Sequence, residues 1–79
     1  MTLKQMRYAL AVQKYGHFGS AAEKCHVTQP ALSQQIQTLE TQCGKKIFER
    51  LGKRVIPTRF GEVFLLEAGR IVAQVDALE

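Results

Sequence analysis

Residues 26–40 decide the fold of this 79-residue chain, and they read His-Val-Thr-Gln-Pro-Ala-Leu-Ser-Gln-Gln-Ile-Gln-Thr-Leu-Glu. Thr28 is a good N-cap, and Pro30 is tolerated in a first helical turn because its missing amide costs nothing there. Apolar residues recur at spacings of four, three and four, on one face of a helix: Leu32, Ile36, Leu39 and Cys43. Gly44 ends this predicted helix, whose opposite face is polar.

Two further helices are predicted before it. Residues 3–15 carry an apolar stripe and stop at Gly16, a residue that accepts the left-handed conformation common just past a helix end. A short helix follows at residues 18–25. Because only a tight connection at residues 26–27 separates it from the next helix, the pair predicts a helix-turn-helix.

The start of the short helix has two interpretations. Ser20 and Glu23 have the spacing of a capping box, which would begin the helix at Ser20. Phe18 fits the first helical position equally well, so the boundary stays open by about two residues.

A basic β-hairpin is predicted after the central helix. Two β-like runs, residues 46–50 and 54–57, flank a turn at residues 51–53 that contains a glycine. Pro57 cannot donate to a ladder, so it belongs at the end or edge of the second strand. One acid and six bases lie in residues 45–59, a charge of +5 against +4 for the whole chain, and the bases are Lys45, Lys46, Arg50, Lys53, Arg54 and Arg59. Charge alone supports a phosphate-binding surface and a solvated loop equally.

A long C-terminal helix is predicted from its cap at Thr58 to the last residue. Its apolar residues follow the heptad spacing of a coiled-coil seam and predict a homodimer interface at Phe64, Ala68, Ile71, Val75 and Leu78. The alternative is that this stripe folds back on the same domain. Since the pattern still runs at Glu79, we expect the natural protein to continue beyond it.

These elements predict a mainly α fold, a winged helix-turn-helix at residues 1–58 followed by a linker and dimerisation helix at residues 59–79. The recognition helix of such a motif enters the major groove with its N-terminal residues at the base edges, and glutamine can bond an adenine edge in two places. The predicted DNA-binding residues are Thr28, Gln29, Pro30, Ser33, Gln34 and Gln37 on the helix and Arg50, Lys53 and Arg54 on the hairpin. A dimer would present two such helices about 34 Å or a multiple of it apart, which matches a pseudo-palindromic duplex.

The composition excludes several other classes. Cys25 and Cys43 have neither zinc-ligand spacing nor the density of a secreted disulfide scaffold. We therefore expect both cysteines to pack in the core of a protein that works in a reducing cytosol. We expect no metal or cofactor. Residues 1–4 lack the features of a signal peptide, and the longest apolar runs are far shorter than the roughly 20 residues that span a bilayer. We therefore expect a soluble protein of the bacterial cytoplasm, associated with the nucleoid, with no membrane partner.

The sequence fits three alternatives to DNA binding less well. An enzyme is not expected, because no Ser-His-Asp set, paired carboxylates or phosphate-cradling glycine loop stands out. An RNA-binding winged helix would need exposed aromatics for stacking, whereas the six Phe and Tyr residues mostly occupy core-like positions. A pure dimerisation or docking module would use the positive charge for solubility alone.

The chain resembles the LysR-type transcriptional regulators over nearly its whole length. The resemblance is carried by Ala21-Ala22, Thr28-Gln29-Pro30-Ala31-Leu32-Ser33, Gln35-Ile36, Leu39-Glu40, Gly44, Phe48, Arg50, Thr58 and Gly61. The pieces His17-Phe18 and Cys25-His26-Val27 are similar to the peroxide-sensing OxyR subgroup. Cysteines 25 and 43 and Pro57 stand where the family usually has leucine, and we expect Pro57 to shorten the second hairpin strand.

The resemblance implies a sequence-specific transcription regulator that binds interrupted palindromes near promoters. It implies base contacts at Gln29, Pro30, Ser33 and Gln34, and a hairpin contact at Lys53 or Arg54. It also implies pairing through the C-terminal helix, a dimer of dimers for the full-length protein, and an effector-sensing domain beyond residue 79. A small-molecule or redox effector would act only through that further domain.

Overall fold

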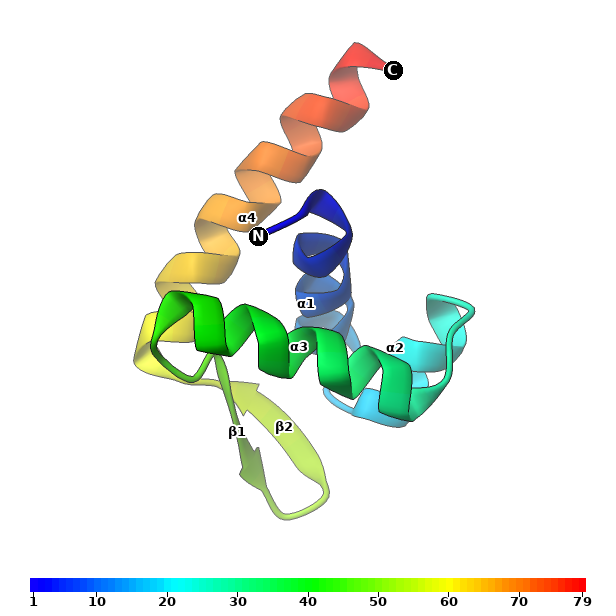
Figure 1. Ribbon diagram of the computed structural model, residues 1–79, viewed down its shortest axis with the longest axis vertical. Coiled ribbons are helices and arrows are strands. Elements are labelled where there is room, and N and C mark those ends of the chain that lie inside the picture. The colour runs from blue at the N-terminus through cyan, green and yellow to red at the C-terminus, as the bar shows by residue number, and fades with distance from the viewer.

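The computed structural model describes residues 1–79 and consists of four helices and one two-stranded antiparallel hairpin (Figure 1). In chain order these elements are α1 (Leu3–Tyr15), α2 (Phe18–Lys24), α3 (Gln29–Cys43), β1 (Phe48–Leu51), β2 (Arg54–Pro57) and α4 (Arg59–Leu78). The hairpin, called the wing below, projects from beneath α3, while α4 extends away from the other side of the molecule (Figure 1). The predicted winged helix-turn-helix followed by a long helix is confirmed.

Helix ends follow the local sequence signals. The Thr28 hydroxyl accepts a hydrogen bond from the Ala31 amide at 3.2 Å, and Gly16 and Gly44 end α1 and α3 in the left-handed conformation. Of the two predicted starts of α2, the structure has Phe18 as the first helical residue. Ser20 therefore lies inside the helix and forms no capping box. The helix-turn-helix connection turns at His26, which has a φ of 60°.

A small core lies where α1, α2 and α3 meet the inner face of the wing and α4. The largest side chains that are completely or almost completely buried there are Val12, Leu32, Leu39, Ile47 and Leu65. Each such aliphatic residue contributes about 1.5–3 kcal/mol by its burial. Ala9 of α1 and Ala21 and Ala22 of α2 are also buried, which allows these helices to approach α3 closely.

The wing is shorter at its start than predicted. β1 begins at Phe48 because the two preceding residues, Lys46 and Ile47, bind α3 and α4 instead of β2. Pro57 does not shorten β2 as expected, since it is the last residue of that strand and lies opposite Phe48 in the register. A proline is accommodated at this position because a terminal strand residue needs no ladder donor.

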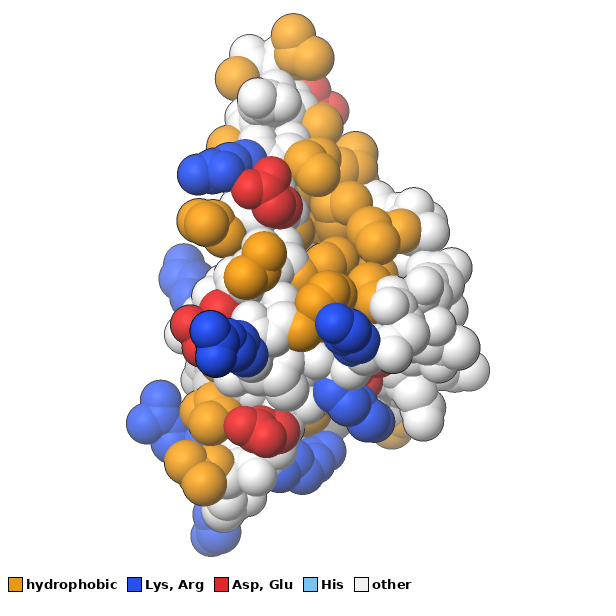
Figure 2. Space-filling model, turned by 90° about the vertical axis from the view of Figure 1, so that its left-hand side faces the viewer, with side chains coloured by type: hydrophobic (Ala, Val, Ile, Leu, Met, Phe, Trp, Pro, Cys, Tyr) orange, Lys and Arg blue, Asp and Glu red, His pale blue; other side chains and the backbone are white.

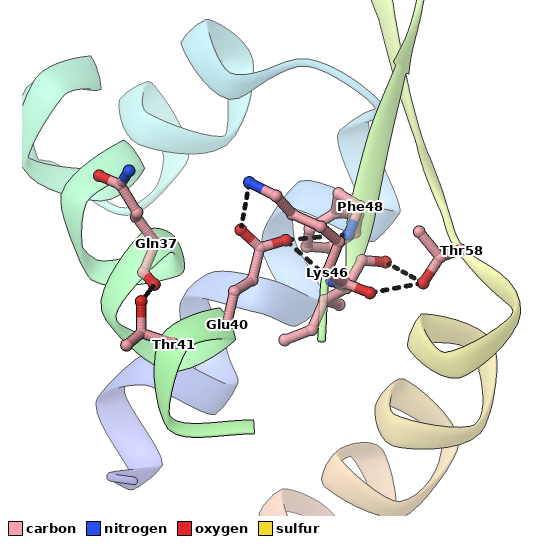
Figure 3. Close-up of polar contacts among 7 residues, drawn as sticks. Gln37, Glu40, Thr41, Lys46, Phe48 and Thr58 are labelled. Atoms are coloured by element: carbon pink, nitrogen blue, oxygen red, sulfur yellow. Dashed lines mark hydrogen bonds and ion pairs between the residues drawn. The ribbon is translucent and has the colours of Figure 1, made fainter. Parts of the chain in front are cut away.

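Glu40 joins α3 to the beginning of the wing (Figure 3). One carboxylate oxygen accepts hydrogen bonds from the amides of Ile47 at 2.8 Å and Phe48 at 3.2 Å, and the other lies 3.9 Å from the Lys46 ammonium. The Glu40 side chain is only 12 % exposed, so these charge-assisted bonds form largely out of water. They set the direction in which the wing leaves α3.

Thr58 and Gly61, at the beginning of α4, contact the same segment at Lys46 and Ile47. The Thr58 hydroxyl donates to the Lys46 carbonyl at 2.7 Å (Figure 3). It also accepts a hydrogen bond from the Gly61 amide at 2.9 Å. The Thr58 amide donates to the Ile47 carbonyl at 2.9 Å. A Cβ atom on Gly61 would lie 2.0 Å from that carbonyl oxygen, so only glycine allows α4 to begin this close to Ile47.

α4 packs its inner face against its own domain. Leu65, Ala68 and Val72 are buried, mainly through contacts with α1. Ala68, which the heptad pattern placed on the partner-facing seam, is 2 % exposed and packs within the chain instead. The reason is that Ala68 shares a helix face with Leu65 and Val72, the residues that cover the core. No helix of the structure has the combined length and hydropathy that crossing a membrane requires.

A surface ion pair fixes the distal part of α4. Arg7 of α1 donates two hydrogen bonds to the Asp76 carboxylate, at 2.7 and 3.3 Å. Nothing in the local sequence around Arg7 indicates a partner 69 residues away. These bonds and the positive charge of Arg7 lower the pKa of the Asp76 carboxyl from its ordinary value of 3.8.

Replacing Gly61 by alanine is expected to lower the free energy of unfolding by about 2–3 kcal/mol, because the added methyl group overlaps the Ile47 carbonyl. Urea denaturation followed by circular dichroism measures the change. Gly69→Ala in the same helix is the matched control, since its Cβ would lie 3.8 Å from Leu10 in ordinary contact. That variant should be unchanged or up to about 1 kcal/mol more stable through helix propensity. Equal stabilities for the two variants would contradict the close approach at Ile47.

The Arg7–Asp76 pair predicts a pH-dependent contribution to stability. Because the pKa of Asp76 is lower in the folded chain, the pair stabilises the fold above about pH 3.8 and loses this effect as the pH falls through the folded pKa. The Tm of Asp76→Asn should therefore lie slightly below that of the parent chain near neutral pH, and the difference should vanish in acid. Arg7→Gln should give the same profile by thermal denaturation, since it removes the same pair. A Tm difference that does not depend on pH would contradict this assignment.

Candidate nucleic-acid interface

The N-terminal half of α3 presents a polar edge to solvent. Thr28, Gln29, Pro30, Gln34 and Gln37 are exposed and Ser33 is half-buried, whereas the apolar residues of the helix face inward. The side chains of these three glutamines make no hydrogen bond within the chain, while two other glutamines, Gln5 and Gln35, bond each other at 3.1 Å. Free amides on a rigid helix can pair with an external donor and acceptor together.

Gln29 lies next to the beginning of α2. A Cβ atom on Gly19 would stand 3.4 Å from the Gln29 side-chain oxygen. The absence of a side chain at position 19 therefore leaves room for this amide. The helix N-terminus beside it also carries a partial positive charge, which favours an anion.

A groove of about 480 Å³ separates α3 from the wing. Ser33 and Gln37 line it from α3, and Lys46 and Arg50 line it from the other side. Of the predicted site residues, Ser33, Gln37 and Arg50 thus share one concave surface, whereas Thr28, Gln29, Pro30 and Gln34 lie outside it. The wall opposite α3 also carries one exposed acid, Glu49, beside the two cations. Polar groups on one wall and mainly cations on the other suit a ligand with a hydrogen-bonding edge and a negatively charged backbone.

The remaining wing cations lie outside this groove. Lys53 and Arg54 are exposed at the hairpin turn, and the Arg54 guanidinium lies beside Gly16, the residue that ends α1. Lys and Arg side chains gather around the wing end of the molecule in Figure 2. The wing therefore carries cations both towards α3 and at its tip, so it can contact an extended polyanion at more than one point.

Two contacts to the wing come from residues that were not predicted as site residues. The Phe18 ring lies 5.0 Å from the Arg50 guanidinium and lines the same groove, and His17 contacts the Lys53 backbone at 3.0 Å. His17 precedes Lys53 by 36 positions and Phe18 precedes Arg50 by 32, so no local periodicity or spacing could indicate these contacts. Lys46 belonged to the basic cluster but was not among the predicted site residues, and its place in the groove depends on Glu40.

The outer surface of α4 carries an apolar patch, which Figure 2 shows along the upper part of the molecule. Ile71 and Leu78 of the predicted seam are 41 % and 89 % exposed, and Phe64 and Val75 are half-buried. Val63 and Leu66, which lie off the heptad pattern, are also exposed. The alternative that this helix folds back on its own domain thus applies to its inner face only.

The cysteines and acidic residues form no metal site. Cys25 and Cys43 are free and half-buried, and both pack against the core. Burial raises the pKa of the Cys43 thiol. No group of three or more histidine, cysteine or acidic side chains could hold a metal ion.

Sequence comparison relates residues 3–62 to the family model described as "Bacterial regulatory helix-turn-helix protein, lysR family". The chain is 44 % identical over 75 residues to the HTH-type transcriptional regulator TfdT of Cupriavidus pinatubonensis, covering 95 % of this chain and 33 % of TfdT. It is 34 % identical over 79 residues to the DNA-binding transcriptional dual regulator OxyR of Escherichia coli, covering 100 % of this chain and 26 % of OxyR. The chain thus spans a third or less of the length of these relatives.

Solved structures with the same fold include two protein–DNA complexes. The DNA-binding domain of CbnR in complex with DNA superposes with a TM-score of 0.92 at 34 % identity, covering 98 % of this chain and 88 % of that one. The DNA-binding domain of BenM with the benA site 1 DNA superposes with a TM-score of 0.94 at 37 % identity, covering 99 % and 88 %. Fold, site geometry and sequence agree, and the chain belongs to the lysR family of bacterial regulatory helix-turn-helix proteins.

Proposed function

We propose that this chain is the sequence-specific, double-stranded DNA-binding domain of a LysR-type transcription regulator and that it acts as a dimer. The observation that carries the proposal is the groove that Ser33 and Gln37 of α3 line together with Arg50 of the wing. The two similar domains whose solved structures are DNA complexes support it. In this proposal residues 1–58 bind DNA, and residues 59–79 link the domain to the rest of the protein.

The N-terminal part of α3 reads base edges in the major groove. Gln29 and Gln34 offer amides that can bond an adenine edge in two places, and Ser33 can donate or accept. Pro30 can contact a thymine methyl group, Thr28 keeps the helix end in its capped form, and Gln37 lies one turn further along the same side. Each good bidentate contact discriminates against a wrong base by about 1–3 kcal/mol.

The wing supplies the electrostatic part of binding. Arg50 faces the groove and is placed for a phosphate, while Lys53 and Arg54 at the tip reach the backbone or an adjacent minor groove. Arginine is favoured where the minor groove is narrow, because the potential there is more negative. These contacts raise affinity for every duplex and make binding depend on salt.

Dimerisation through α4 completes the proposed mode of action. The exposed flank of α4 with Ile71 and Leu78, bordered by half-buried Phe64 and Val75, is the surface that a second copy would cover. Ala68 is not part of that surface, since it is buried in its own chain. A two-fold pair of domains presents its two α3 helices to half-sites about 34 Å or a multiple of it apart. Assembly into a tetramer, sensing of an effector and action at the nucleoid of the bacterial cytoplasm would belong to the whole protein.

The proposal predicts different effects for the two parts of the interface. Gln29→Ala or Ser33→Ala should weaken binding to the selected site by about 1–3 kcal/mol and leave binding to unrelated duplexes nearly unchanged. Lys53→Ala or Arg54→Ala should weaken both and reduce the slope of affinity against salt by about one unit. Selection of duplexes from a random pool defines the site, and fluorescence anisotropy at several salt concentrations measures the affinities.

Gln42→Ala is the matched control, because this glutamine is exposed near the other end of α3 and lies outside the groove. Its affinity should equal that of the parent chain. Equal affinity of the parent chain for every duplex at fixed salt would reject sequence-specific reading. Stronger binding to single-stranded RNA than to duplex DNA in competition would favour the RNA-binding alternative.

A further inference from the structure

The beginning of α2 contacts the turn of the wing. His17 is the N-cap residue of α2, yet its side chain forms no capping bond. Its Nδ1 atom lies 3.0 Å from the backbone carbonyl oxygen of Lys53 instead. A carbonyl can only accept, so Nδ1 carries the hydrogen and donates it. The imidazole therefore ties the hairpin turn to the helix-turn-helix.

The preceding residue holds the next part of the wing. The Gly16 carbonyl accepts a hydrogen bond from the Val55 amide at 2.8 Å. The Arg54 guanidinium packs beside Gly16, where a Cβ atom would stand 3.8 Å from its nearest nitrogen. β2 thus has β1 on one side and the end of α1 on the other, and residues 53–55 all contact residues 16–17.

The following residue contacts a wing cation. The Phe18 ring centroid lies 5.0 Å from the Arg50 guanidinium carbon, within the range of a cation–π interaction. Phe18 and Arg50 both line the groove beside Ser33 and Gln37. Gly16, His17 and Phe18, called the wing support below, therefore contact both strands of the wing.

We propose that His17 and Phe18 are positioning residues for the wing cations. His17 fixes the turn that carries Lys53 and Arg54, and Phe18 fixes Arg50 over the groove. A two-stranded hairpin is only marginally stable alone, and ordering it on binding would cost affinity. The wing support lowers that cost because it holds the cations in place before DNA arrives. This inference rests on the proposed function for its effect on affinity, but the wing geometry can be tested in the free protein.

The His17 contact is tested with three variants. His17→Ala removes the contact, His17→Phe keeps a ring without the N–H donor, and His17→Gln keeps a donor. Backbone ¹⁵N relaxation of Gly52 and Lys53 in the free protein is expected to show lower order in the first two variants and recovery in the third. Duplex affinity should fall by about 2- to 10-fold and recover in the same order, which is the range that one hydrogen bond contributes.

The Phe18 contact is tested by a double-mutant cycle with Arg50. Phe18→Leu, which keeps an apolar side chain in the partly buried site, should weaken duplex binding by about 2- to 5-fold, while Phe18→Tyr should not. In an Arg50→Ala background, Phe18→Leu should have no further effect, because the residue it positions is absent. Thermal denaturation of each variant separates this coupling from a loss of fold.

The outcomes are distinct. Unchanged relaxation at Gly52 and Lys53 in His17→Ala, or equal effects of Phe18→Leu with and without Arg50, would overturn the positioning role. Weaker DNA binding with an unaltered wing would assign His17 a direct DNA contact and also overturn it. If the parent chain failed to prefer any duplex, the proposed function would fall, whereas the relaxation data would still decide whether His17 orders the wing.

Discussion

The arrangement of the molecule depends on the contacts that Glu40, Thr58 and Gly61 make with Ile47, called the Ile47 clamp below. The Ile47 side chain is buried in the core, its amide donates to the Glu40 carboxylate, and its carbonyl accepts from Thr58. Gly61 lets the first turn of α4 press against the same carbonyl. α3, the wing and α4 therefore meet at one residue whose backbone groups are both paired. Because an unpaired buried amide or carbonyl is costly, another path for this segment would be strongly disfavoured.

The Ile47 clamp explains how a small domain forms a shaped interface. A polar helix edge and a cationic hairpin are common features of protein surfaces, and neither forms a binding site alone. Glu40 directs the wing away from α3 at an angle that leaves a groove between them, with Ser33 and Gln37 on one wall and Arg50 on the other. His17 and Phe18 at the beginning of α2 also contact the wing. The wing is thus contacted by residues of α3 and by residues at the beginning of α2.

The apolar residues of α4 contribute to two surfaces, one buried against the domain and one exposed. The inner face of α4 covers the core with Leu65, Ala68 and Val72, and Arg7 holds its distal part through Asp76. A flank of the helix is left apolar and exposed around Ile71 and Leu78. The apolar stripe is thus too wide for one partner, and the two interpretations of the heptad pattern apply to different faces of the helix.

Sequence by itself determined the elements, because helix caps, glycine stops and apolar periods act over a few residues. Thr28, Gly16 and Gly44 mark helix ends that the structure has at the same positions, and the winged helix-turn-helix followed from their order. The polar edge of α3 and the cationic hairpin were also evident from residue types. Whether the predicted site residues bind DNA stays a prediction.

Only the tertiary structure determined which residues from distant parts of the chain contact each other. The contacts of Arg7 with Asp76, of His17 with Lys53 and of Phe18 with Arg50 join residues 32 to 69 positions apart, and no period or motif connects them. Burial likewise depends on packing, so Ala68 is buried although Val75, one heptad further along, is only half-buried and Ile71 and Leu78 of the same predicted seam are exposed. Short-range signals can specify a helix or a turn, but the side chain that meets it from elsewhere is set by the packing of the whole chain.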